Sequence, residues 1–84
     1  MKHFEYTTSA LVCSRKILFD LDEENKIHNL SFIGGCNGNL KAISKLCEGQ
    51  DASKIITILS GNTCGGRPTS CADQLSLALK EALQ

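Results

Sequence analysis

The hydrophobic periodicity of this chain changes at Gly34-Gly35, and that change decides which folds are open to it. Before this point apolar residues alternate with polar ones, as in Ile17, Phe19 and Leu21, which is typical of β-strands with one buried face. After it, apolar residues recur every three or four positions, as in amphipathic helices. Strands followed by a run of helices indicate an α+β fold in which three helices pack on one face of a three-stranded antiparallel sheet.

The strands of this sheet are expected in the first third of the chain. A polar turn at residues 22–25 joins two alternating segments into a hairpin, and a third segment forms an edge strand. In the second hairpin strand, alternation predicts that His28, Leu30 and Phe32 share a face, with His28 packed or solvent-exposed rather than a ligand. His3 lies in a terminus that is expected to fray. The three predicted strands are residues 4–8, 15–21 and 27–33.

Three helices are predicted in the rest of the chain, each with its own start or stop signal. The first covers about residues 38–48 and ends at Gly49. Asp51 is expected to cap the second, which stops at Ser60-Gly61. The third follows Pro68, where Ser70 and Asp73 fit a capping box.

The length of 84 residues predicts a single domain, residues 1–84, and excludes catalysts built on large barrels. The chain has no Trp, three Phe and one Tyr, so its core is expected to be aliphatic and small. A domain of this size buries only about 60% of its unfolded surface and is marginally stable unless a metal or another cross-link supports it.

The charge and hydropathy of the chain argue against nucleic acid and membranes as its partners. Nine basic residues, spread along the chain, balance nine acidic ones, so nucleic-acid binding through a cationic patch is not expected. The sequence has no apolar stretch of membrane-spanning length and no signal-peptide pattern, so we expect a cytoplasmic protein that acts away from membranes. Thiols stay reduced in the cytoplasm, and five cysteines therefore favour metal or redox chemistry over disulfides.

The five cysteines occupy two kinds of segment. Cys13, Cys36, Cys64 and Cys71 lie in loops or at the ends of predicted elements. Cys47 lies on the apolar stripe of a predicted helix, where cysteine behaves as a small hydrophobic residue, and we assign it to the core. Cys36 and Cys71 lie at predicted helix N-termini, where free amides and the helix dipole favour the thiolate that binds metals.

Four thiolates satisfy a tetrahedral zinc ion, so the four element-end cysteines are the predicted ligands of a closed, structural zinc site. Asp73, Asn37 and Asn39 are the predicted supporting residues around them. The spacing is not that of a familiar zinc finger, because no C-x-x-C pair occurs, and the alternative that several of these cysteines are simply buried stays open. No catalytic residue is predicted.

Three short motifs resemble the TSCPD domain family, whose name describes a Thr-Ser-Cys-Pro-Asp motif. They are residues 12–14, residues 35–40 and residues 69–73, and they span nearly the whole chain. Ala72 replaces the proline of the motif, which is expected to affect the rigidity of the helix start more than its chemistry. The resemblance implies that all the cysteines except Cys47 belong to the family pattern. Because the module also occurs at the C-terminus of some ribonucleotide reductases, it further implies an association with such an enzyme.

The layout is also similar to that of the iron–sulfur scaffold proteins of the NifU/IscU type, in which three cysteines hold zinc or a nascent cluster. This similarity implies that Cys13, Cys36 and Cys71 are the ligands and that the fourth element-end cysteine is an additional thiol. Arg15 stands where those proteins have an aspartate, and Ser70 where they have a histidine. Neither replacement supplies the missing ligand, so a zinc site is favoured over cluster assembly.

Two functional hypotheses follow. The first is a zinc-binding accessory domain; the second is a thiol-redox or iron–sulfur cluster carrier that serves a partner enzyme. Both require a protein partner that the sequence does not identify, and they leave the oligomeric state open. The chain is too short for ribonucleotide reductase catalysis itself, and it carries no adenine or ribose motif.

Overall fold

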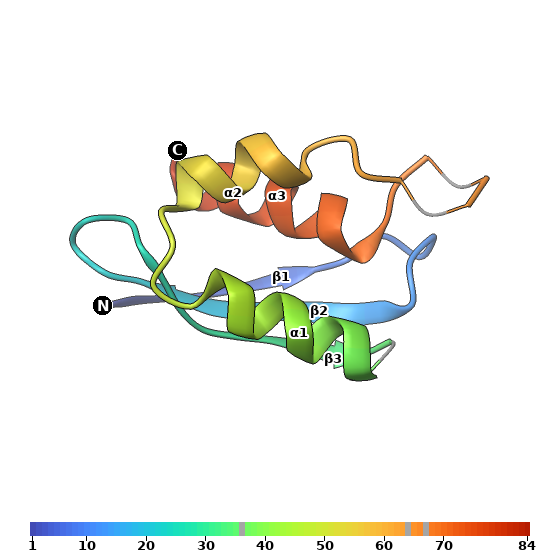
Figure 1. Ribbon diagram of the computed structural model, residues 1–84, viewed down its shortest axis with the longest axis horizontal. Coiled ribbons are helices and arrows are strands. Elements are labelled where there is room, and N and C mark those ends of the chain that lie inside the picture. The colour runs from blue at the N-terminus through green and yellow to red at the C-terminus, as the bar shows by residue number, and fades with distance from the viewer. Residues whose placement is uncertain (36, 64, 67) are drawn as a thin grey trace.

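The computed structural model describes residues 1–35, 37–63, 65–66 and 68–84, and in these ranges three strands are followed by three helices (Figure 1). The strands form an antiparallel sheet in the order β1-β2-β3. This arrangement confirms the predicted α+β fold class. The elements are β1 (Lys2–Thr7), β2 (Ser14–Leu21), β3 (Ile27–Gly34), α1 (Asn37–Cys47), α2 (Ala52–Leu59) and α3 (Cys71–Ala82).

The hydrophobic core is built on one face of the central strand. Ile17, Phe19 and Leu21 alternate along β2 and are at most 4% exposed, and Phe4 of β1 stacks on Phe19 with ring centroids 5.4 Å apart. Figure 1 shows α2 beside α3, with α1 running along β3. All three helices contribute to the core on this face, as predicted. Their buried contributions to it are Cys47, Ala52, Ile55, Leu75, Ala78 and Leu79.

Strand β3 departs from the predicted alternation. Ile27 and Leu30 are both buried although they are three residues apart, which a regular strand does not allow. Asn29 between them has a φ of 56°, and the register with β2 shifts at this point, as at a β-bulge. The prediction that His28 shares the face of Leu30 is therefore wrong: His28 pairs with Asp20, on the polar side of the sheet.

The helix ends follow the local sequence in part. Gly49 has a φ of 75° and lies two residues after the last residue of α1, at the helix end where it was predicted. Asp51 occupies the N-cap position of α2, but its side chain makes no capping hydrogen bond. At α3 the Asp73 amide donates to Ser70 Oγ at 3.1 Å, as predicted. A capping box also requires the Asp73 carboxylate to accept from the Ser70 amide. This part of the prediction is wrong, because the carboxylate accepts from the Gly61 amide and the Thr69 hydroxyl instead.

The turn between β2 and β3 is tied to the end of α1 by a histidine between two carboxylates. His28 Nε2 lies 2.8 Å from Asp22 Oδ2, and His28 Nδ1 lies 2.7 Å from Glu48 Oε2. Asp22 and Glu48 raise the pKa of His28. Hydrogen bonds from the Lys26 amide and then from His28 lower the pKa of Asp22 to about 2.

The same network continues across the sheet to β1. Glu48 Oε1 accepts from the Asn29 amide at 2.9 Å, and Asn29 Nδ2 donates to Asp20 Oδ2 at 2.9 Å. Asp20 Oδ1 lies 2.7 Å from His3 Nδ1, and this contact raises the pKa of His3. His3, which was expected near a fraying terminus, lies in β1 and pairs with Asp20 of β2, and its ring contacts the Asp20 carboxylate. None of the described helices is long and apolar enough to cross a membrane.

We predict that the protein loses stability as the pH rises from about 6 to 8, because both histidines have a raised pKa in the folded state. The charged form of each ring is favoured by folding, so its contribution is complete below the unfolded pKa of about 6.5 and is lost as the pH passes the folded value. Urea unfolding at a series of pH values measures the effect. The urea midpoint of unfolding of the His3→Gln/His28→Gln variant should change less between about pH 6 and 8 than that of the parent protein. An equal change in the two proteins would contradict the prediction.

Candidate functional site

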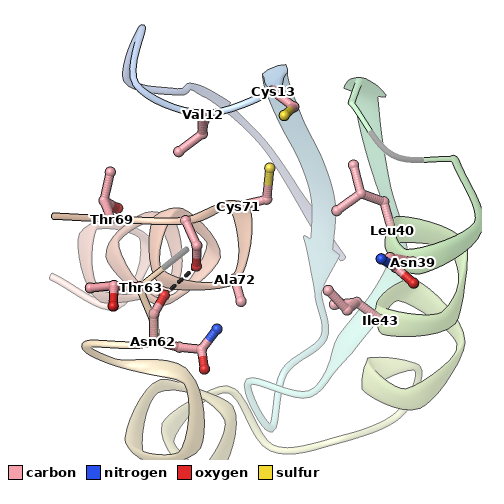
Figure 2. A pocket seen from close by; sticks show the side chains of 11 residues that line it. Val12, Cys13, Asn39, Leu40, Ile43, Asn62, Thr63, Thr69, Cys71 and Ala72 are labelled. Carbon is pink, nitrogen blue, oxygen red and sulfur yellow. Dashed lines mark hydrogen bonds between the residues drawn. The ribbon is translucent and has the colours of Figure 1, made fainter. Parts of the chain in front are cut away.

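A cavity of about 220 Å³ opens where the loop after β1, the start of α1 and the start of α3 meet (Figure 2). Its described walls are mainly apolar, and two thiols, Cys13 and Cys71, lie in them. Cys13 comes from the end of the β1–β2 loop and is exposed, while Cys71 is the first residue of α3 and is half-buried. The apolar part of the wall consists of Val12, Leu40, Ile43 and Ala72.

The segments that carry Cys13 and Cys71 are joined by a hydrogen bond. The hydroxyl of Ser14 donates to Cys71 Sγ at 3.1 Å, and Ser14 directly follows Cys13 in the chain. Figure 2 shows the two sulfur atoms in the space between β2 and α3. The Ser14 hydroxyl therefore ties the start of α3 to the residue next to Cys13.

The end of β3 is packed against the same place. Gly34 pairs with Ser14, and Gly35 has a φ of 87°. A Cβ atom on Gly35 would lie 3.2 Å from Ser14 N and 2.7 Å from Leu40 Cδ1, so only glycine fits without displacing a neighbour. The chain therefore passes directly over Ser14 just before residue 36. Cys36 itself lies outside the described residues.

Hydrogen bonds between described residues attach the loop after α2 to the start of α3. The Gly61 amide donates to Asp73 Oδ1 at 2.7 Å, and the Thr69 hydroxyl donates to Asp73 Oδ2 at 2.6 Å. The Ser70 hydroxyl donates to the Asn62 carbonyl. Asn62 and the following Thr63 line the cavity. Cys64, the next residue, lies outside the described residues.

Gln74 is a buried polar residue that the sequence analysis missed. It is 4% exposed, its Oε1 accepts from the Ser9 amide at 2.9 Å, and its Nε2 donates to Thr69 Oγ1 at 3.0 Å. It thus ties the β1–β2 loop to the start of α3. Ser14 was missed as well, although its place beside Cys13 was a usable signal. No sequence signal distinguishes Gln74 from a solvent-exposed helix residue.

The predicted supporting residues have different roles. Asp73 holds backbone and hydroxyl groups around the start of α3, as described above. Asn39 lines the cavity, whereas Asn37 is the first residue of α1 and its side chain is outside the described part. Cys47 is 3% exposed and its burial raises its pKa, which confirms its assignment to the core.

The described residues alone do not complete a metal site. Within residues 1–35, 37–63, 65–66 and 68–84, no group of three or more Cys, His, Asp or Glu side chains is placed to hold a metal ion. The described cavity therefore offers two thiols, Cys13 and Cys71, and a metal with more thiolate ligands requires Cys36 or Cys64. The segments before both of these cysteines are held near the cavity, the first by the pairing of Gly34 with Ser14 and the second by the hydrogen bonds of Gly61 and Asn62.

A family model for the TSCPD domain matches residues 1–83. The chain belongs to the TSCPD domain family. Comparisons with curated proteins and with solved structures found no match. The family's signature corresponds here to Thr69-Ser70-Cys71-Ala72-Asp73, and the structure gives each polar member of it a task. Thr69, Ser70 and Asp73 hold the start of α3 and the preceding loop, and Cys71 presents its thiol to the cavity.

We predict that Gly35→Ala destabilises the protein more than Gly49→Ala does. Both glycines have a positive φ, which costs a non-glycine residue roughly 1–2 kcal/mol. Only at Gly35 does the added methyl group also meet neighbours, whereas nothing lies within 4 Å of it at Gly49. The difference in the free energy of unfolding, measured by urea denaturation, should be about 1–3 kcal/mol, as for overpacking of a tight site. Equal effects would show that the contact with Ser14 and Leu40 is relieved at little cost.

Proposed function

We propose that this protein is a small metal-binding domain in which Cys13, Cys36, Cys64 and Cys71 hold a zinc ion. The observation that supports it best is the presence of Cys13 and Cys71 in one cavity, joined through the Ser14 hydroxyl. The anchored segments before the other two cysteines add to this support. Thiolate sulfurs are preferred zinc ligands, and a zinc ion bound here would link the end of the β1–β2 loop, the start of α3 and the two segments that carry Cys36 and Cys64.

The exposure of Cys13 and the open cavity favour an accessible site over a closed, structural one. Cys71 is only half-buried, and neither thiol belongs to the hydrophobic core cluster. A metal at such a place can be reached by a chelator or by a group of another protein. We therefore propose that the domain is an accessory module that holds its metal for a partner protein, and the resemblance makes a ribonucleotide reductase the first partner to test.

An iron–sulfur cluster or a redox-active thiol pair is the second candidate. A cavity of about 220 Å³ has more room than a single zinc ion requires, and this observation favours a larger occupant. The same two thiols, Cys13 and Cys71, would carry this function, so the identity of the bound element separates the candidates. Zinc without sulfide supports the first, and iron with acid-labile sulfide supports the second.

We predict about one equivalent of zinc in protein purified without an affinity tag, and its loss in the Cys13→Ser and Cys71→Ser variants. Elemental analysis after gel filtration measures the metal, and the far-ultraviolet circular dichroism spectrum reports the fold. Zinc bound to the native state should raise the midpoint of thermal unfolding of the parent protein. Because the core cluster contains neither Cys13 nor Cys71, the metal-free variants should keep their helical content.

Cys47→Ala is the matched control, because this thiol is buried in the core and away from the cavity. It should lower stability by about 1 kcal/mol through the loss of packed atoms and leave the zinc content unchanged. Zinc and iron both below about a tenth of an equivalent in the folded parent protein would overturn the proposal. Equal zinc content in all three variants would show that the metal lies elsewhere.

A further inference from the structure

Helix α1 lies between two surface grooves, and each of them shares one lining residue with the thiol cavity. Leu40 lines the cavity and also the groove between α1 and β3, which has a volume of about 300 Å³. Ile43 lines the cavity and also the groove between α1 and α2, of about 270 Å³. We call the two grooves on either side of α1 the α1 surface.

The most exposed apolar side chains of the helices lie on this surface. Leu46 of α1 and Ile58 of α2 both line the groove between these helices, and they are 75% and 60% exposed. Single exposed apolar residues are ordinary in a folded protein. Two that flank one groove, with Ile55 and Leu59 at its base, form an apolar patch of the kind that marks interaction sites.

The charge of the α1 surface is cationic, although the whole chain has no net charge. Lys41 and Lys45 line the groove next to β3, and Lys54 lines the groove next to α2. None of the described residues that line the two grooves or the cavity is Asp or Glu. Within the described part of the chain these three lysines form no ion pair, and Glu48, the acidic residue directly after α1, contacts His28 and the Asn29 amide.

We propose that the α1 surface binds an acidic, amphipathic segment of a partner protein, next to the thiol cavity. The apolar side chains of such a segment would pack on Leu46 and Ile58. Its carboxylates would pair with the three lysines that make no ion pair within the described residues. A second copy of this chain fits less well, because a twofold contact would bring two cationic surfaces together. Nucleic acid fits less well because the centre of the surface is apolar. The proposal does not require that the thiols bind metal.

A displayed library of random dodecapeptides, selected on the biotinylated full-length protein, tests this proposal. The selected peptides should be enriched in Asp and Glu together with Leu, Ile or Phe. One of them, added to ¹⁵N-labelled protein, should shift amide signals of α1 and α2. Its affinity should fall by about tenfold or more in the Leu46→Ser/Ile58→Ser variant and in the Lys41→Glu/Lys45→Glu/Lys54→Glu variant, as expected when central contacts are lost.

The matched controls are Leu77→Ser and Lys2→Glu, which change an exposed apolar residue and an exposed lysine away from the α1 surface. Both should leave the affinity unchanged. Selected peptides that are basic or uncharged, or that bind all the variants equally, would overturn it. So would concentration-dependent shifts of α1 and α2 signals without peptide, which would assign the surface to self-association. Shifts of these signals by a single-stranded oligonucleotide and not by acidic peptides would assign it to nucleic acid.

Discussion

The start of α3 is the point on which the geometry of the candidate site depends. Two segments that are distant in sequence and the loop that precedes α3 are hydrogen-bonded to it. The β1–β2 loop is held by Gln74, β2 by the bond between Ser14 and Cys71, and the loop after α2 by Asp73. These bonds use backbone amides, hydroxyls and a carboxylate whose partners are fixed, and every buried side-chain nitrogen and oxygen of the described residues has a partner. The start of α3, and with it the Cys71 thiol, is therefore held by hydrogen bonds as well as by the apolar packing of α3 in the core.

The general fold could be predicted from the sequence because its signals are local. The change from alternating to helical periodicity gives the three strands and three helices, and Gly49 and Ser70 mark helix ends with a physical mechanism that needs no tertiary information. The face of His28 could not be predicted. A strict period of two assumes a regular strand, and Asn29 adopts a left-handed conformation that any reading of alternation ignores. One extra residue in β3 is enough to turn the side chains at the beginning of the strand to the opposite face of the sheet.

The sequence predicted where Cys47 lies, but not the contacts around the candidate site. Cys47 was assigned to the core from the kind of segment it occupies, and its burial confirms this assignment. Cys13 and Cys71 line the cavity, whereas Cys36 and Cys64 lie outside the described residues. The contacts of Ser14 and Gln74 join residues 57 and 65 positions apart in the sequence, and nothing in the local sequence specifies such partners. The partners of Asp73 could not be predicted either, because its position suggested that its carboxylate would cap the Ser70 amide. Its carboxylate instead binds Gly61 and Thr69, because the folded loop brings two unpaired donors within reach.

The separation of the core from the cavity bears on what a bound metal would do. A domain of this length was expected to need a metal for stability, yet the core cluster links all three helices to the sheet without Cys13 or Cys71. Most of the hydrogen bonds around the start of α3 likewise involve neither thiol, and they connect the segments that line the cavity. On the proposed function, a metal held by Cys13 and Cys71 would lie outside the core cluster, which contains neither thiol. Its binding free energy would then add to the stability that the core provides. A module of this kind would be suited to loading and releasing its metal.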